Sequence, residues 1–346
     1  MGQSLWNTVE FHQQEIFLDI GTIWIIQDLG LSGIVDYERF GGNPHRHYVR
    51  RDTRKIVDYL TAQLSNFTNA NRPISQRIPA GQIVGGSGVG KSTECWGWFH
   101  NVPYNRMWIH NDSKTDFVFT VVKVSQDLLG NWIWKHQVAE SFEAVKTALK
   151  SANIRVAVFD GTFQKDPMNC FAQICSKKNI FHVTCTSGQS VPLSAARASQ
   201  FCYGKTFIVE GFTRDEYLAA EGFLHPDRTV DDIHRMYYFA GGSARYFFQY
   251  FDSIGDLCNL FRSKIRRILT ISNYSAFFSG AVGDSSIDAV NSLTTYRNGN
   301  TDARPVLVSK FVVRLLFESA DMNFINAAKD VYWQGWCTEL DFFIRV

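Results

Sequence analysis

Apolar and polar residues follow two different periods along this chain, and the balance between them changes near position 212. In residues 81–209, short apolar runs alternate with segments whose apolar positions recur every three or four residues, a pattern typical of strands followed by helices. The run 154–159 is almost uninterrupted in its apolar character, as expected for a central parallel strand buried on both faces. Beyond 212 the helical period dominates. The pattern predicts a doubly wound, mostly parallel α/β sheet followed by a helical lid subdomain.

The individual elements follow from the same periods. Ile56, Leu60 and Leu64 form one apolar stripe and predict a helix over 54–64, which a polar loop at 65–79 ends. Residues 272–304 are rich in Gly, Ser and Asn and predict a loop or linker. The other predicted strands are 81–84, 106–110, 116–124, 154–159, 181–186 and 206–209, and the other predicted helices are 91–99, 140–151, 213–223, 230–239, 244–252, 257–271 and 307–317.

These elements divide the chain into four parts. Residues 1–53 contain short apolar runs and turn residues and predict a small lead-in subdomain. Residues 54–211 form the predicted α/β core, and 212–320 form the helical lid. Residues 321–346 are a C-terminal tail. A chain of 346 residues is long enough for this organisation.

Composition and charge narrow the class of protein. A formal net charge of +2 excludes a strong overall attraction to nucleic acid or to anionic membranes, although Arg262, Lys264, Arg266 and Arg267 form a local basic group. The seven cysteines are scattered and contain no Cys-x-x-Cys pair, which favours reduced thiols inside a cell. The N-terminus lacks a signal-peptide pattern, and no apolar run reaches the ~18 residues needed to span a bilayer. We therefore expect an intracellular chain without a membrane span.

One motif has a specific chemical meaning. The segment Gly85-Gly-Ser-Gly-Val-Gly-Lys-Ser92 matches the pattern G-x-x-x-x-G-K-[ST] at every position, between a predicted strand and a predicted helix. Glycines let backbone N–H groups turn toward a phosphate, Lys91 places a cation beside the β- and γ-phosphates, and Ser92 offers a hydroxyl to Mg²⁺. The helix that begins at Lys91 directs its positive end at the same anion. The predicted nucleotide-binding residues are Gly85, Gly86, Ser87, Gly88, Val89, Gly90, Lys91, Ser92 and Thr93.

A second acidic position completes the predicted site. Asp160 ends the buried strand 154–159, where a carboxylate holds Mg²⁺ together with Ser92. Asp160 is followed by Gly161, whereas many hydrolases place a glutamate there to orient the attacking water. The general base is therefore not identifiable from the sequence. Asp112, beyond the predicted strand 106–110, and Asp166 are candidates for this role, and each is also accounted for as a solvated loop residue.

Two further groups are candidates for sensing the terminal phosphate. Thr184, Thr186 and Ser187 end the strand after Asp160, and they are equally well explained as ordinary strand-end hydroxyls. In the helical part, Gly241-Gly-Ser-Ala-Arg-Tyr246 lets a helix begin close to the nucleotide, so that Arg245 reaches the terminal phosphate and stabilises transition-state charge. The plain alternative is a glycine turn before an exposed arginine.

The order of these motifs resembles one family. A helix reading Tyr48-Val-Arg-Arg, the P-loop, Val158-Phe-Asp-Gly161, Phe212-Thr-Arg-Asp-Glu-Tyr217 and the segment 241–246 together are similar to the NTPase module of Crinkler effectors and retrotransposon hot spot proteins, which is related to AAA+ and STAND ATPases. The resemblance covers about residues 46–320. It implies that Lys91 and Ser92 bind phosphate and magnesium, that Asp160 binds the metal, and that Arg245 is the sensor arginine.

The same resemblance concerns the two ends of the chain. In that family a restriction-endonuclease-like domain often follows the NTPase, and residues 332–343 look like its opening helix. A complete nuclease centre and the ubiquitin-like header of Crinklers are not seen in this sequence, which puts delivery into a host in doubt. A protein partner or nucleic acid reached through an effector domain is implied, and the oligomeric state is not readable.

Three functions remain open at this point. The first is a Mg²⁺-dependent ATPase, or GTPase, whose lid moves with hydrolysis. The second is a nucleotide-dependent switch with little turnover, which the glycine after Asp160 favours. The third is a small-molecule kinase, which the helical second half and Arg245 disfavour.

Overall fold

The computed structural model describes residues 9–12, 23–25, 46–48, 50–71, 80–111, 117–126, 132–140, 142–151, 153–161, 165–187, 203–269, 292–297 and 304–319. Its centre is an eight-stranded sheet with the order β1-β7-β6-β5-β8-β9-β4-β10. The strands are β1 (Val9–His12), β4 (Ala80–Gly85), β5 (Arg106–Asn111), β6 (Phe117–Gln126), β7 (Trp132–Glu140), β8 (Val156–Gly161), β9 (Phe181–Ser187) and β10 (Tyr203–Val209).

The sheet has a parallel half and an antiparallel half. Strands β5, β8, β9, β4 and β10 are parallel neighbours, whereas β6, β7 and β1 extend the sheet from β5 in antiparallel fashion. Strand β9 lies between β4 and β8, and both pair with it in parallel. The carboxyl ends of β4 and β8, which carry the predicted site, are therefore at the same edge of the sheet. The register aligns Gly85 of β4 with Ser187 of β9, and Asp160 of β8 with Cys185 of β9.

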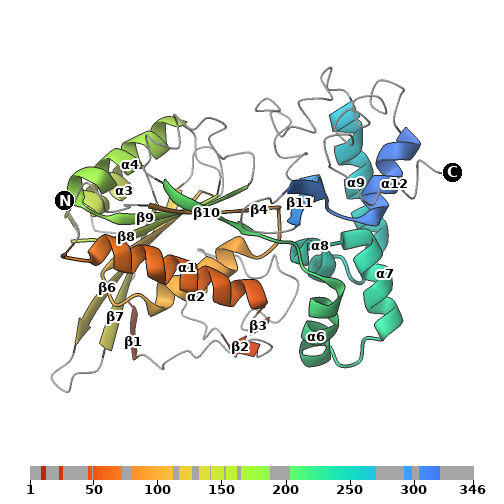
Figure 1. Ribbon diagram of the computed structural model, residues 1–346, viewed down its shortest axis with the longest axis horizontal. Helices are drawn as coiled ribbons and strands as arrows, with labels where there is room; N and C mark the ends of the chain where they lie inside the picture. Colours follow the sequence, from red (N-terminus) through yellow and green to blue (C-terminus); the bar gives the residue numbers. More distant parts are fainter. Residues whose placement is uncertain are drawn as a thin grey trace.

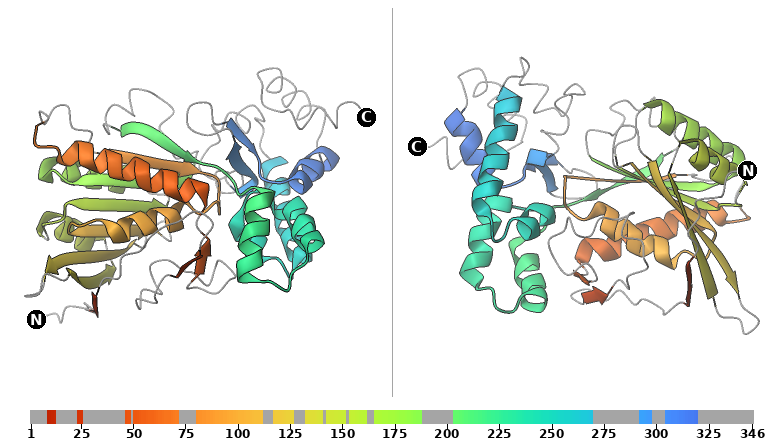
Figure 2. Two further views of the ribbon diagram at one scale, coloured as in Figure 1. Left: turned by 60° about the horizontal axis from the view of Figure 1, so that its bottom comes forward. Right: turned by 180° about the vertical axis from the view of Figure 1, so that it is seen from behind.

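Helices cover both faces of this sheet, as the sequence predicted. Helices α1 (Arg51–Thr68) and α2 (Lys91–Asn101) share one apolar core with alternate residues of the strands, such as Trp108 and Val158. Helices α3 (Phe142–Ser151) and α4 (Lys165–Lys178) form a second core with the other set, such as Ile109 and Phe159. This alternation is the period of two that a strand imposes. Figures 1 and 2 show the two helical layers on opposite sides of the strands. The predicted doubly wound, mostly parallel α/β sheet is confirmed.

A helical lobe follows β10 and has an aromatic core of its own. Tyr217 stacks on Phe247 with ring centroids 3.8 Å apart, and Phe261 and Phe311 belong to the same cluster. Figure 1 shows this lobe beyond the ends of β4 and β10, with its strand β11 on the side next to the sheet. The lobe contains α6 (Arg214–Leu224), α7 (Val230–Ala240), α8 (Ala244–Gln249), α9 (Ile254–Leu269) and α12 (Lys310–Ser319), together with the hairpin β11 (Thr294–Arg297) and β12 (Arg304–Leu307).

Several sequence expectations differ from the structure. The resemblance placed Tyr48-Val-Arg-Arg in a helix, but Tyr48 ends β3 (Arg46–Tyr48), which pairs with β2 (Ile23–Ile25). Arg50 has an extended backbone, and α1 begins after it. The predicted loop at 272–304 contains β11, because pairing with β12 is a long-range contact that composition does not reveal. The predicted start of α3 at 140 is wrong because Glu140 pairs with Val118 in the sheet.

Within the predicted core, 54–211, two elements were missed altogether. The strand β7 does not follow either period clearly, and it is extended by pairing along its whole length with β6. Helix α4 contains Pro167 in its first turn, where the missing N–H has no intrahelical acceptor to lose. A proline normally ends or interrupts a helix, but at this position Pro167 is compatible with the start of α4.

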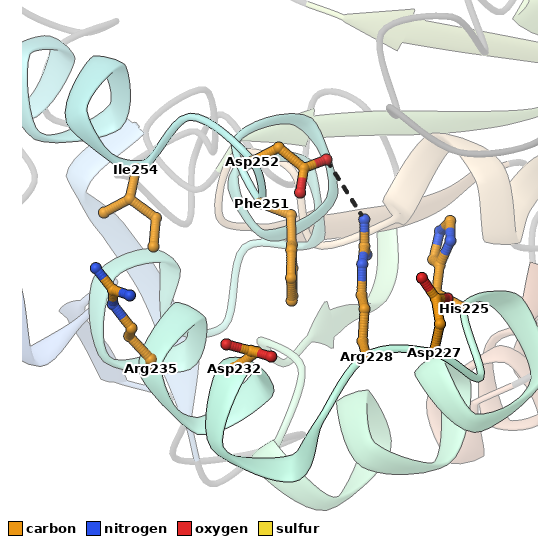
Figure 3. A pocket seen from close by; sticks show the side chains of 8 residues that line it. All are labelled: His225, Asp227, Arg228, Asp232, Arg235, Phe251, Asp252 and Ile254. Atoms are coloured by element: carbon orange, nitrogen blue, oxygen red, sulfur yellow. Dashed lines mark ion pairs between the residues drawn. The ribbon is translucent and has the colours of Figure 1, made fainter.

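The helical lobe has a pocket of about 420 Å³ whose eight lining residues all lie between His225 and Ile254. Figure 3 shows their side chains. Arg228 crosses the pocket, paired with Asp252 at 3.9 Å and stacked 3.7 Å from the ring centroid of Phe251. None of its lining residues belongs to the phosphate loop.

Among the helices described, none combines the length and apolar character that crossing a membrane requires.

Candidate functional site

The phosphate loop lies between β4 and α2, as the motif predicted. Gly88 and Gly90 have φ values of +75° and +93°, which side chains with a Cβ rarely adopt. Gly90 is the N-cap of α2, so the N–H groups at the start of this helix face the loop. Val89 is fully buried and anchors the loop against the sheet core. The backbone thus has the curvature of an anion-binding turn at a helix N-terminus.

Lys91 lies within this turn. Its Nζ donates a hydrogen bond to the carbonyl oxygen of Gly86 at 2.5 Å. Burial lowers the pKa of Lys91 to about 8, the negative charge of Asp160 opposes this shift, and the positive charge of Arg245 adds to it. A desolvated ammonium group of this kind is strongly stabilised by an incoming polyanion.

This lowered pKa predicts how nucleotide affinity varies with pH. Phosphate binding needs the ammonium form, and a bound triphosphate raises the pKa of Lys91, so the complex holds a proton that the free protein loses above pH 8. We expect affinity to be flat from pH 7 to about 7.5 and to fall by up to about tenfold per pH unit above 8. Calorimetric titrations from pH 7 to 9.5 at saturating Mg²⁺ measure this, and constant affinity across pH 8–9.5 would contradict it.

Ser92 and Asp160 form the second part of the site. The Ser92 hydroxyl donates to Oδ1 of Asp160 at 2.6 Å, which joins the start of α2 to the end of β8. Asp160 is 3 % exposed. A hydroxyl and a carboxylate are oxygen ligands of the kind that Mg²⁺ takes, and this ion is usually held by one or two protein groups plus water and substrate phosphates. The two side chains therefore fit the predicted magnesium site, and Thr93, buried in the next position of α2, completes the predicted segment.

The helical lobe contacts the phosphate loop directly. The Ser243 hydroxyl donates to the carbonyl oxygen of Ser87 at 3.0 Å. The backbone N–H of Arg245 donates to the carbonyl oxygen of Gly88 at 3.2 Å. A Cβ at Gly88 would come within 2.5 Å of the Ser243 Oγ and 2.6 Å of the Arg245 Cβ. Glycine at position 88 is therefore required both by its φ and by the close approach of α8.

The side chain of Arg245 extends toward the same loop. Its Nη1 lies 3.5 Å from Oγ of Ser87. Its Nε is buried and, among the residues that the structure describes, has no hydrogen-bond partner. A buried donor without a partner costs about 1–3 kcal/mol. An anion at the loop would supply the missing acceptor, which is what the predicted sensor role requires.

The hairpin strand β11 lies against the opposite part of the loop. A Cβ at Gly86 would come within 2.5 Å of the carbonyl oxygen of Thr294 and 2.8 Å of the Cα of Thr295. The carbonyl oxygen of Tyr296 accepts from the N–H of Gly211, at the end of the core. The loop is therefore enclosed by two segments of the helical lobe.

The other predicted residues are less central. Asp112 lies outside the described residues, and Asp166 lies in the first turn of α4. Thr184 aligns with Gln82, inside the sheet, and its buried hydroxyl has no partner within the described part of the chain. Thr186 and Ser187 align with Val84 and Gly85, so these two, rather than Thr184, stand at the edge of the phosphate loop.

Sequence reasoning missed three contributors to the site. Ser243 was quoted only as a small residue, although its hydroxyl bonds to the loop. Arg50 and the segment 294–296 were not assigned any role in the site. A Ser at the N-cap of a short helix was a readable signal, since Ser243 also accepts from the N–H of Tyr246. The approach of β11 had no signal in the sequence.

Comparison with known proteins gives likenesses in structure alone. No family model and no curated protein matches the chain. It is similar to C. elegans PCH-2, at 9% identity and a TM-score of 0.37, over 72% of this chain and 78% of that one. It is also similar to the Aeropyrum pernix ORC1 protein in complex with DNA, at 9% identity and a TM-score of 0.37, over 79% of this chain and 93% of that one. The function of this chain therefore has to be inferred from its own contacts, and the resemblance to Crinkler and retrotransposon hot spot proteins stays a prediction.

Proposed function

We propose that this chain binds a nucleoside triphosphate with Mg²⁺ at the phosphate loop and hydrolyses it. The observation that carries the proposal is the Ser92–Asp160 hydrogen bond of 2.6 Å beside the half-buried Lys91, in a loop with left-handed glycines. A cation, two oxygen ligands for magnesium and a turn of backbone N–H groups are the parts that triphosphate chemistry uses.

Each residue has a distinct role in the proposed reaction. The loop N–H groups and Lys91 hold the β- and γ-phosphates, and Ser92 and Asp160 would hold Mg²⁺, whose charge would offset the charge that develops on the phosphate oxygens. Water attacks the γ-phosphorus, the bond to the bridging oxygen breaks, and the nucleoside diphosphate, inorganic phosphate and a proton leave. Arg245 stabilises the negative charge on the terminal phosphoryl group as that bond breaks.

The first test is phosphate release from ATP and from GTP, with Mg²⁺ or with excess EDTA. We expect release to require Mg²⁺, and Asp160→Asn to reduce it by about 10- to 100-fold, because the amide no longer accepts the Ser92 hydrogen bond as a charged group. The matched control is Asp256→Asn, an exposed carboxylate in the first turn of α9. Release by the Asp160 variant at the rate of the control would remove Asp160 from the site.

A nucleotide-dependent switch with little turnover is the second candidate. It is favoured by Gly161 after Asp160, where many hydrolases have a glutamate, and by the contacts of Ser243 and Arg245 with the loop, which tie lobe position to loop occupancy. Tight binding of ATP without phosphate release would select this reading. Phosphate transfer that appears only with an added acceptor would select a kinase instead.

The proposed biological setting follows from the resemblance. The NTPase, comprising a core over 54–211 and a lid over 212–320, would drive or regulate an effector that acts on a protein or nucleic acid, as in Crinkler and retrotransposon hot spot proteins. The segment 332–343, which looks like the start of a nuclease module, lies outside the described residues.

A further inference from the structure

Arg50, the residue before α1, is a buried arginine that joins three separate segments. The residue is 2 % exposed. Its Nη1 donates to the carbonyl oxygen of Val89 in the phosphate loop at 3.1 Å. Its Nη2 donates to the carbonyl oxygens of Glu210 and Gly211 at 3.2 and 3.3 Å, and its Nε donates to Oε1 of Glu216 at 3.2 Å. One guanidinium group therefore contacts the loop, the connector after β10, and the first turn of α6.

The surroundings of Arg50 explain why arginine is needed here. The guanidinium stacks 3.9 Å from the ring centroid of Phe212, in the same connector. Burial by itself lowers the pKa of Arg50, and the negative charges of Glu216, Glu94 and Asp52 together raise it above its ordinary value. A planar fork with five donors reaches acceptors in several directions at once, which the single ammonium of lysine does not.

The contact with Val89 controls part of the phosphate loop. The C=O and N–H of one trans peptide point in opposite directions, so holding the Val89 carbonyl also sets the direction of the Gly90 N–H. Gly90 has a φ of +93° and no Cβ, and glycine is free to leave such a conformation unless a neighbour holds it. Arg50 holds the peptide before Gly90, and the N–H of Glu94, which donates to the Gly90 carbonyl oxygen at 2.9 Å, holds the peptide after it.

The contact with Glu216 controls the start of the helical lobe. Glu216 also accepts from the backbone N–H of Thr213 at 2.9 Å, and the Thr213 hydroxyl accepts from the N–H of Glu216, which is a capping box at the N-terminus of α6. The carboxylate that pairs with Arg50 is thus the same group that caps α6. A change in the position of the guanidinium acts directly on that cap.

We propose that Arg50 is a positioning residue that transmits occupancy of the phosphate loop to helix α6, through its bonds to the Val89 carbonyl and the Glu216 carboxylate. This inference rests on the proposed function, since it needs a nucleotide in the loop. Bound phosphate orders the Gly90 peptide, the Val89 carbonyl then holds the guanidinium, and the guanidinium holds the capping carboxylate of α6.

Hydrogen exchange of the α6 amides with and without Mg²⁺ and a non-hydrolysable ATP analogue tests the proposal. In the unaltered chain we expect the analogue to slow exchange in residues 213–224 by about tenfold. In Glu216→Gln the amide still caps α6, because glutamine also serves at that position of a capping box, but the charge that attracts Arg50 is gone. We expect the slowing to fall below about twofold in this variant while calorimetry still detects binding of the analogue.

Two further variants make the result specific. Asp215→Asn removes the neighbouring carboxylate of the same turn, whose side chain is 85 % exposed, and should keep the full response. Arg50→Lys keeps the charge but loses the fork, and should lose the response as Glu216→Gln does, with both variants folded in thermal unfolding.

The outcomes separate this inference from the proposed function. Equal slowing by the analogue in Glu216→Gln and in the unaltered chain overturns the inference. This includes the case in which the variant exchanges faster by the same factor with and without the analogue, since the response is then intact and the effect is purely structural. If the unaltered chain binds and hydrolyses ATP but its α6 exchange does not respond, only the inference fails. If calorimetry shows that the unaltered chain does not bind nucleotide, the proposed function fails and the inference with it.

Discussion

Replacing Lys91 with alanine abolishes detectable nucleotide binding while the protein stays folded; this is the largest effect that we expect. The ammonium group lies partly buried within the phosphate loop, where it donates to the Gly86 carbonyl oxygen and its pKa is lowered to about 8. Removing one partner of a buried, hydrogen-bonded charge pair costs about 2–5 kcal/mol, a loss of roughly 30-fold in affinity or more. The fold itself loses little, because the buried charge is a cost in the free protein.

Calorimetric titration with Mg-ATP measures this effect, and a thermal unfolding scan reports whether the variant is folded. The matched control is Lys178→Ala, which removes an exposed lysine from the last turn of α4 and should bind as the unaltered chain does. A folded Lys91→Ala protein with unchanged affinity would show that the phosphates do not lie in this loop.

Replacing Arg245 with alanine should leave nucleotide affinity within about threefold and reduce the hydrolysis rate by about 100- to 1000-fold. The side chain lies 3.5 Å from Ser87, with a buried Nε that needs an acceptor. An arginine that meets charge developing in the transition state contributes mostly to kcat, and loss of one such donor typically costs about 10²–10³ in rate. The backbone contact is kept, because alanine also has the N–H that donates to the Gly88 carbonyl oxygen.

Steady-state phosphate release gives kcat, and equilibrium titration of the same variant gives affinity, so the two effects are separated. Arg262→Ala is the control, an exposed arginine on α9 whose described hydrogen bond is to Asn259. An Arg245 variant that hydrolyses ATP at the original rate would exclude a role in the reaction. One that binds weakly but turns over normally would make Arg245 a binding residue instead.

The arrangement of the candidate site residues could be predicted from the sequence because they are local or lie at strand ends. The glycines, Lys91 and Ser92 occupy eight consecutive positions, and Asp160 ends a strand whose burial is visible in its composition. A parallel sheet then brings the ends of β4 and β8 to one edge, so the 2.6 Å contact between Ser92 and Asp160 follows from fold class and motif together. The position of Arg245 beside the loop could be predicted from the glycines before it, because close approach of two backbones needs residues without a Cβ; its sensor role stays a prediction.

What the sequence did not predict depends on contacts between distant segments. Arg50 is 166 positions from Glu216, and no period or spacing links them. The strand β11 lies in a polar stretch that composition assigns to a loop, yet it pairs with β12 and packs on Gly86. The strand β7 was missed because pairing with β6, rather than its own pattern, determines its conformation. Such contacts are formed by the tertiary fold, and local preference is a weak guide where they decide.

The two carbonyl groups of Ser87 and Gly88 that accept bonds from Ser243 and Arg245 have a consequence for any molecule that binds the helical lobe. Free-energy coupling between two sites is the same in both directions. If the proposed triphosphate binds more tightly when α8 contacts the loop, a partner that pulls α8 away would weaken that binding by the same factor by which the triphosphate weakens binding of the partner. Such a partner would act as a nucleotide-exchange factor, and one that presses α8 against the loop would act as a retention factor, without either of them touching the nucleotide.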